Sequence, residues 1–372
     1  MSVGVAIIGS GVFVREKHLP AVQEAPSLTL KALFSRSLKS AQALGSDLSG
    51  VDLYSEDAGE GKAFSDLLAR SDIKGVIMAL PIPAQPEYIK AALSAGKHVL
   101  SEKPIAKDVA TARELLDWYN KNIDKSKVTW GVAENFRFFE CYRYGAEKVK
   151  ELGKVLGFST KVHVFVKEGS KYHATSWRTK PSYQGGFLLD GGVHFIAATR
   201  VLLSDSAHAT SVSAFTALHQ EHLPPVDTVD AIWKLSNGSS GTFSNSFAAP
   251  VPVTEYRVVC ERGTVTTGFG TVPFAPAYVT VKRADADDEE KKEFPEVGFG
   301  VNPEVAAWGQ KLEKGGFDER QLPEEALKDL EIVCPLPCQM MPVIHSADCI
   351  PSQLEAMLKS GEQGGAPVTL QV

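Results

Sequence analysis

The segment that most restricts the fold lies near the start of the chain, at residues 3–13. It reads "VGVAIIGSGVF", an apolar run that ends in Gly9 and Gly11 and passes into residues able to open a helix. Such a run is typical of a buried parallel strand. The two glycines permit a sharp turn and a close approach to a ligand, and the helix N–H groups beyond them favour a pyrophosphate. Val14 stands at the third position of the G-x-G-x-x-G pattern, so the turn taken alone is equally compatible with a purely structural role.

A second strand is predicted at residues 28–36, "LTLKALFSR". A dinucleotide-binding unit usually has an acidic residue at the end of this strand, where it binds the hydroxyls of the adenosine ribose. This sequence has Ser35 and Arg36 there, with Lys39 one turn further on. A carboxylate would repel a 2′-phosphate, whereas a hydroxyl and a guanidinium bind one, so the pattern favours NADP(H) over NAD(H). The alternative is that Arg36 and Lys39 are ordinary solvated charges.

Residues 73–104 predict another β-α-β unit. A strand ends in the turn "LPIPAQ" (80–85), a helix follows, and the next strand ends in Glu102-Lys103-Pro104. In a doubly wound sheet, ligands bind at the carboxyl ends of the strands. We therefore expect Lys103 to project toward a reacting carbon, with Glu102 holding its position or tuning its pKa. The alternative is a surface ion pair before a proline that starts a helix.

The pattern changes after residue 126. Short alternating segments with Gly, Asn and Ser turns predict a mostly antiparallel sheet. The predicted fold class is therefore α/β, with an N-terminal Rossmann doubly wound parallel sheet and a C-terminal α+β domain that has an open antiparallel sheet. The predicted domains are residues 1–126, residues 127–322 and a C-terminal helical segment at 323–372 that returns toward the Rossmann domain.

One predicted helix of the second domain carries candidate chemistry. "GGFLLDGGVHFI" (185–196) places Asp190 and His194 four residues apart, on one helical face. A carboxylate beside an imidazole can orient it and raise its pKa, which suits proton transfer to or from a substrate hydroxyl. The alternative is an Asp that caps a helix and a His packed in a core.

Three segments together resemble a known family. "AIIGSGVF", "GKHVLSEKPIA" and "GGFLLDGGVHFI" occur in the order and at the separations found in the Gfo/Idh/MocA oxidoreductases. The resemblance covers nearly the whole chain, and it implies that Lys103, Asp190 and His194 are catalytic. Which of Lys103 and His194 is the principal acid or base varies within the family. It also implies a homo-oligomer, a dimer or tetramer formed through the sheet of the second domain.

The resemblance also implies a set of cofactor-binding positions. "AENFRF" (133–138) and "TSWRT" (175–179) match family positions near the nicotinamide and the substrate, and Tyr172 and Tyr183 are further candidate donors. The family commonly has Asn and then His in the turn where this chain has Ala84 and Gln85. The predicted cofactor-binding residues are Gly9, Gly11, Val12, Phe13, Ser35, Arg36, Lys39, Leu80, Pro81, Glu102, Lys103, Asn135, Trp177 and Arg178.

The function implied is an NADP(H)-dependent oxidoreductase that interconverts a carbonyl and a hydroxyl on a small polar substrate, such as a sugar, a polyol or a related alcohol or aldehyde. Two alternatives stay open. One is a non-catalytic dinucleotide-binding regulator similar to the fungal galactose-pathway repressor, which shares this fold. The other is an imine or enone reductase of secondary metabolism. The joint presence of Lys103, Asp190 and His194 favours an enzyme over a regulator.

Composition argues against other classes of function. The net charge is −6 and no charge run is long, which argues against a nucleic-acid or membrane-surface partner. No apolar window approaches the ~20 residues of a membrane span, and no basic region precedes the first apolar run as in a secretory signal. Five irregularly spaced cysteines indicate free thiols in a reducing compartment, and no ligand set completes a metal site. We therefore predict a cytoplasmic protein without a metal.

The segment 333–353 interrupts what otherwise reads as one helix. It contains "CPLPCQMMPVIHSADCIPSQ", which has no helical period and four prolines. We hypothesise a translated retained intron, because Val333-Cys334 can be encoded as a fungal-type donor, Ala347-Asp348 as a branch point and Gln353 as an acceptor. The alternative is a genuine surface loop.

Overall fold

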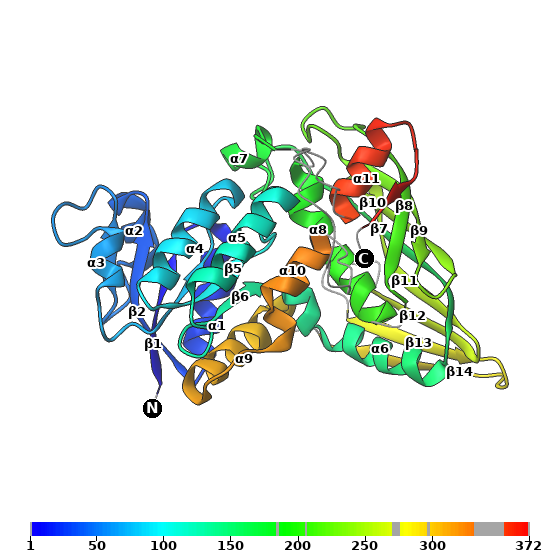
Figure 1. The fold of residues 1–372 in the computed structure, drawn as a ribbon, viewed down its shortest axis with the longest axis horizontal. Helices are drawn as coiled ribbons and strands as arrows, with labels where there is room; N and C mark the ends of the chain where they lie inside the picture. Colours follow the sequence, from blue (N-terminus) through cyan, green and yellow to red (C-terminus); the bar gives the residue numbers. More distant parts are fainter. Residues whose placement is uncertain are drawn as a thin grey trace, which may run out of the picture. The chain divides into compact units, whose positions relative to one another are not determined.

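The computed structural model describes residues 2–183, 186–204, 207–269, 276–295, 298–330 and 353–370. The chain divides into two compact units (Figure 1). The N-terminal unit comprises residues 1–107, 111–138 and 297–326, and the C-terminal unit comprises residues 108–110, 139–296 and 327–372. Each unit has its own sheet, and each is described by itself below.

The N-terminal unit is built on a parallel six-stranded sheet with the strand order β3-β2-β1-β4-β5-β6. The order reverses between β1 and β4, which is where a doubly wound sheet binds its ligand. This confirms the predicted Rossmann sheet. The strands are β1 (Val3–Ile8), β2 (Leu28–Ser35), β3 (Asp52–Ser55), β4 (Gly75–Met78), β5 (His98–Glu102) and β6 (Trp130–Ala133).

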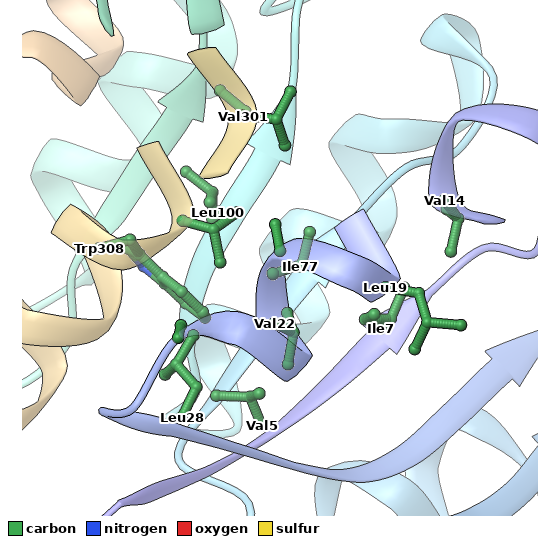
Figure 2. Close-up of a cluster of buried hydrophobic side chains, with 14 of the residues drawn as sticks. Val5, Ile7, Val14, Leu19, Val22, Leu28, Ile77, Leu100, Val301 and Trp308 are labelled. Carbon is green, nitrogen blue, oxygen red and sulfur yellow. The ribbon is translucent and has the colours of Figure 1, made fainter. Parts of the chain in front are cut away.

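Helices connect these strands, as expected for parallel neighbours. Trp308 is 3% exposed and belongs to the same buried cluster as Leu28, Ile77 and Leu100, so α9 packs on one face of the sheet (Figure 2). The helical segments of this unit are η1 (Val14–His18), α1 (Leu19–Glu24), α2 (Leu38–Gly45), α3 (Phe64–Leu68), η2 (Ile82–Ala84), α4 (Gln85–Ser94), most of α5 (Val109–Asn122), η3 (Asn135–Phe138), η5 (Gly298–Gly300), α9 (Val301–Lys314) and η6 (Glu319–Gln321).

The C-terminal unit contains a nine-stranded sheet with the order β14-β13-β12-β11-β7-β10-β9-β8-β15. Among the described strand pairs of this second sheet only β7–β10 is parallel, which confirms the mostly antiparallel sheet. The strands are β7 (Val155–Phe165), β8 (Ala209–Ala217), β9 (Thr228–Leu235), β10 (Ser240–Ser246), β11 (Ala248–Cys260), β12 (Gly263–Phe269), β13 (Ala277–Arg283), β14 (Glu289–Phe294) and β15 (Val368–Thr369).

The remaining helices are α6 (Glu140–Leu152), α7 (Ser176–Thr179), α8 (Gly186–Leu203), α10 (Pro323–Leu330) and α11 (Gln353–Glu362). By length and composition, α8 is apolar enough to cross a membrane, which differs from the sequence expectation that no segment approaches this length. Within the structure, however, 72% of this helix is buried. A buried core helix of a folded domain passes the same test, so the finding is weak support for a membrane span.

The division of the chain differs from the predicted one in two places. Residues 130–133 form β6, which pairs with β5 and completes the parallel sheet, so the N-terminal unit extends to Phe138 rather than to residue 126. The segment that returns to this unit is 297–326, whereas residues 327–372 belong to the C-terminal unit. The first boundary lies between the end of η3 and the start of α6 and the second lies within α10, so no linker marks either of them in the sequence.

The suspected intron at 333–353 lies almost wholly outside the described residues, since only Gln353 of this segment is described, as the first residue of α11. Cys141 and Cys260 are buried thiols that form no disulfide among the described residues, and the other three cysteines lie in the segment that is not described. Both hypotheses for that segment therefore stay predictions.

Candidate functional site

The glycine turn after β1 is shaped to leave space for a ligand. Gly9 has a φ of +124°, and a Cβ at this position would lie 2.3 Å from the carbonyl oxygen of Ala79, so only glycine fits. A Cβ on Gly11 would meet no atom within 4 Å, so the space beside it is open. Val12 and Phe13 are half-buried and lead into the π-helical turn η1. The turn therefore packs its first glycine against the Ala79 backbone and leaves open space beside its second, and its predicted contact with a pyrophosphate stays a prediction.

The end of β2 holds the charged residues predicted to bind the ribose. Ser35 is buried, and its hydroxyl lies 2.8 Å from the hydroxyl of Ser10 in the glycine turn. Arg36 and Lys39 are both exposed. The hydroxyl and the two cations thus stand at the same edge of the sheet as the glycine turn, which is the arrangement that a 2′-phosphate would need.

Two carboxylates that the sequence analysis missed lie beside these cations. Asp57 follows β3 and accepts hydrogen bonds from the Leu38 backbone N–H at 2.6 Å and from the Ser55 hydroxyl at 2.7 Å. The neighbouring Glu56 accepts a hydrogen bond from the hydroxyl of Tyr88. The signal was present in "YSED" (54–57), since β3 follows β2 in a doubly wound sheet and must end at the same edge.

The turn after β4 contributes a buried amide. Leu80 and Pro81 are half-buried, Ala84 is the last residue of η2, and Gln85 is the first residue of α4. Gln85 is 1% exposed and donates from Nε2 to the main-chain oxygen of Glu102 at 3.1 Å. The departure from the family pattern at this turn therefore gives Gln85 a defined partner, the strand end that precedes Lys103.

The end of β5 is held by a buried histidine. His18 of η1 is fully buried, and its Nε2 lies 2.6 Å from Oε1 of Glu102, whose side chain is 12% exposed. Lys103 follows directly, is half-buried and is joined to Pro104 by a cis peptide bond. Glu102 is thus fixed through its side chain and its carbonyl group, and Lys103 leaves the strand from a fixed point. Nothing in the sequence alone singled out His18.

A third carboxyl group lies behind this strand end. Glu304 of α9 is 1% exposed, and burial raises the pKa of its carboxyl well above the usual range. The charges of Glu102 and Glu134 add to this shift, while Arg137 and Arg320 oppose it. Burial beside two other carboxyl groups therefore favours the protonated form of Glu304.

Asn135 makes a hydrogen bond to the main chain within the N-terminal unit. It is 5% exposed and donates from Nδ2 to the main-chain oxygen of Phe299 at 2.6 Å. Phe299 has a φ of +55°, a left-handed conformation that is uncommon for a bulky residue. Asn135 therefore stabilises this turn, and its predicted contact with a cofactor stays a prediction.

The candidates of the C-terminal unit gather at the start of α8. Arg178 donates from Nε to Oδ2 of Asp190 at 2.8 Å, and its guanidinium lies 3.9 Å from the centre of the Trp177 ring. Asp190 is 7% exposed, and His194 is half-buried one turn further along the helix. The Asp190 carboxylate therefore has a cation as a partner, which the sequence did not indicate.

Tyrosines complete this cluster. The ring of Tyr172 lies 5.9 Å from the Arg178 guanidinium. The hydroxyl of Tyr183 is buried and has no hydrogen-bond partner among the described residues. Burial and the nearby Asp190 charge raise the pKa of Tyr183, whereas Arg178 opposes the shift. The Tyr183 phenol is therefore neutral at physiological pH, and its predicted role as a donor stays a prediction.

Lys103 belongs to the N-terminal unit, and Asp190 and His194 belong to the C-terminal unit. The N-terminal unit holds the glycine turn and the strand end before Lys103, the C-terminal unit holds a polar cluster at the start of α8, and the roles predicted for both stay predictions. No group of three potential metal ligands occurs among the described residues. A Rossmann sheet with a glycine turn and a lysine at the end of β5 defines a class of protein, the dinucleotide-binding oxidoreductases.

Comparison with known proteins identifies the family within this class. Residues 3–129 match the NAD-binding Rossmann domain of the Gfo/Idh/MocA oxidoreductase family, and residues 148–266 match a C-terminal domain of the same family. A dehydrogenase named FPY6 from Fusarium mangiferae is 40% identical over 339 residues, which cover 89% of this chain and 94% of that protein. The chain belongs to the Gfo/Idh/MocA family of oxidoreductases.

Two other relatives extend this comparison. A D-xylose 1-dehydrogenase (NADP⁺) from Haloferax volcanii is 26% identical over 280 residues, or 74% of this chain and 79% of that protein. The crystal structure of an oxidoreductase from Thermotoga maritima superposes with a TM-score of 0.80 at 24% identity, covering 99% of this chain and 98% of that one. The latter similarity supports the fold alone.

Proposed function

We propose that this protein is an NADP(H)-dependent oxidoreductase that interconverts a carbonyl and a hydroxyl group on a small polar substrate, such as a sugar or a polyol. The observation that carries the proposal is the 2.6 Å contact between His18 and Glu102, which fixes the strand end from which Lys103 departs. Lys103 lies at the same sheet edge as the open glycine turn, because β1 and β5 are parallel strands of one sheet. A relative that is an NADP⁺-dependent sugar dehydrogenase supports the substrate class.

The dinucleotide, when bound, supplies or accepts the hydride. In the direction of reduction, the Lys103 ammonium donates a proton to the carbonyl oxygen, and in the direction of oxidation the Lys103 amine accepts it. His194 is the second candidate for this proton transfer. Asp190 stands one helical turn before His194 and orients its imidazole, and Arg178 holds the Asp190 carboxylate through a hydrogen bond of 2.8 Å.

The proposal favours NADP(H) because of the residues after β2. Ser35, Arg36 and Lys39 offer a hydroxyl and two positive charges, and no carboxylate comes from β2 itself. Charge-assisted hydrogen bonds from a guanidinium to phosphate are among the stronger polar contacts. Asp57 and Glu56 lie at the same edge, and their negative charges oppose this preference.

A paired substitution tests the proposed activity. We expect Lys103→Met to lower turnover in a screen of sugars and polyols by ~10²–10⁴-fold while NADPH still binds, since this is the usual contribution of a general acid or base. Lys107→Met, four residues along and exposed, is the matched control and should keep turnover. Equal turnover in the wild type and Lys103→Met would contradict the assignment.

The same screen separates the two alternatives. A chain that binds NADPH but turns over no carbonyl or alcohol would favour the regulator that resembles the galactose-pathway repressor. Turnover of imines or enones alone would favour a reductase of secondary metabolism. The cytoplasmic location is part of the proposal and would be tested by fractionation of the source cells.

The proposal includes a homo-oligomer formed through the nine-stranded sheet. On this sheet Ile232 is 59% exposed and Val259 is 38% exposed, and both line a groove of about 500 Å³ together with Arg257. An exposed apolar groove on a sheet suits a second copy of the same chain. We expect light scattering to give a multiple of the chain mass for the wild type and a lower mass for Ile232→Asp. A monomeric wild type would contradict this part.

A further inference from the structure

The N-terminus of α2 already has an anion bound to it, and that anion is a side chain of this protein. Oδ1 of Asp57 accepts the backbone N–H of Leu38, the first residue of α2, at 2.6 Å. β3 runs parallel to β2 with Ser55 opposite Ser35, so residues 56–57 leave the sheet beside residues 36–37. The acidic residue absent from the end of β2 is therefore supplied by the neighbouring strand.

Asp57 is charged in neutral solution. The hydrogen bonds from Ser55 and Leu38 lower the pKa of its carboxyl below the usual range. The side chain is exposed, so solvent screens its charge at long range. Its effect is therefore greatest on groups in direct contact, above all the Leu38 N–H that it occupies.

The other charges of this edge have partners of different kinds. Glu56 is next to Asp57 but binds the Tyr88 hydroxyl on α4, not the helix. Arg36 lies near enough to Tyr88 to act on the pKa of that hydroxyl. Within the loop after β3, Asp57 thus differs from Glu56 in one respect that matters for a ligand, because it holds a main-chain donor of α2.

We propose that Asp57 sets the preference between the phosphorylated and the unphosphorylated dinucleotide by competing with a ribose 2′-phosphate for the Leu38 N–H. This inference rests on the proposed function. A 2′-phosphate beside Ser35 and Arg36 must either displace Asp57 from this amide or lie against a like charge. A ribose hydroxyl has no such conflict, because it can donate a hydrogen bond to the carboxylate. Asp57 is a specificity-determining residue that opposes Arg36 and Lys39.

Three variants separate competition for the amide from simple charge. Asp57→Ala removes the charge and frees the Leu38 N–H. Asp57→Asn removes the charge but keeps an oxygen that can accept this N–H. Glu56→Ala is the matched control, since it truncates the adjacent exposed carboxylate without touching α2. A thermal melt of each variant shows that it is folded.

The measurement is a fluorescence titration of the purified full chain and each variant with NADPH and with NADH. We expect Asp57→Ala to bind NADPH about tenfold more tightly, because a charge-assisted hydrogen bond becomes available to the phosphate, with NADH affinity unchanged or weaker. Asp57→Asn and Glu56→Ala should each change NADPH affinity by less than about threefold.

Two results would overturn the inference while leaving the proposed function intact. One is an Asp57→Ala gain no larger than that of Glu56→Ala, which would show that only charge matters. The other is an equal gain for NADPH and NADH, which would show that Asp57 does not act on the 2′-phosphate. Failure of the wild type to bind either dinucleotide would overturn this inference and the proposed function together.

Discussion

The ends of β5 and β2 lie at the same edge of the parallel sheet, but their side chains differ in burial and in bonding. At the end of β5, Glu102 is held by His18 and Gln85, which are 0% and 1% exposed. At the end of β2, Arg36 and Asp57 are exposed charges that solvent can reach. Both ends belong to one parallel sheet, so the difference comes from the side chains and not from the backbone.

The contrast follows from what each end must do in the proposed function. A proton-transfer group must stay within a fraction of an ångström of its place, and buried hydrogen-bonded neighbours provide that rigidity. A site that only selects between two dinucleotides can use screened charges of both signs, whose balance single substitutions can change. We therefore expect substitutions at the buried end of β5 to be poorly tolerated and substitutions at the exposed end of β2 to be tolerated.

The largest effect is expected from the buried pair. His18→Leu leaves the carboxylate of Glu102 without its partner in a site where the side chain is only 12% exposed. Losing a hydrogen bond to a charged group usually costs about 1.5–3 kcal/mol, so we expect the free energy of unfolding in urea to fall by roughly this amount. His18→Gln, whose amide can still donate to Glu102, should lose much less. If His18→Leu and His18→Gln lower the free energy of unfolding equally, the hydrogen bond to Glu102 does not stabilise the end of β5. The proposed difference between the ends of β5 and β2 would then be wrong.

The sequence predicted the residues at the end of β5, but not the buried residues that hold them in place. Glu102-Lys103-Pro104 stands out because three unusual residues end an apolar run, and the sheet topology then places them. His18 and Glu304 do not stand out, because their partner lies 84 or 202 residues away along the chain and pairs of single residues have no periodicity. The sequence therefore predicted the group proposed to react and not the groups that hold it.

At the exposed end the outcome was mixed. The absence of an acid after β2 was read correctly from the sequence, yet Asp57 supplies one from β3. The order of strands contained this information, since β3 must lie beside β2 in the fold that was predicted. In the C-terminal unit, the Arg178–Asp190 contact joins α7 to α8 across a segment whose pattern gave no register. Local patterns thus predicted elements, whereas contacts between elements needed the structure.

Substitution of Glu304 tests whether ionisation of a buried carboxyl group near the end of β5 lowers the free energy of unfolding. Its folded pKa is raised above that of the unfolded chain, so the folded state binds more protons than the unfolded state at pH values between the two. Stability from this group is therefore complete at low pH and is lost as pH rises through the folded pKa. Glu304→Gln resembles the protonated form and should remove that loss.

The expected result is a difference in urea stability between Glu304→Gln and wild type that is small near pH 4.5. It then grows by up to ~1.4 kcal/mol for each pH unit until the folded pKa is passed. Asp318→Asn is the control, because Arg320 lowers the pKa of that carboxyl and the sign of its pH dependence is opposite. A difference that does not change with pH would mean that the pKa of Glu304 is the same in the folded and unfolded chains, and its burial would need another explanation.

The smallest effect is expected from Lys39, at the exposed end. Its ammonium is exposed, so Lys39→Gln should weaken NADPH binding by only about two- to threefold at low salt. The loss should disappear when ionic strength rises from about 0.05 M to about 0.5 M, because the Debye length then falls below the separation of the charges. Lys121→Gln, exposed on α5, should show no loss at either salt concentration. A loss for Lys39→Gln that persists at high salt would mean that this lysine contacts the phosphate directly, and the exposed end would then share the rigidity of the buried one.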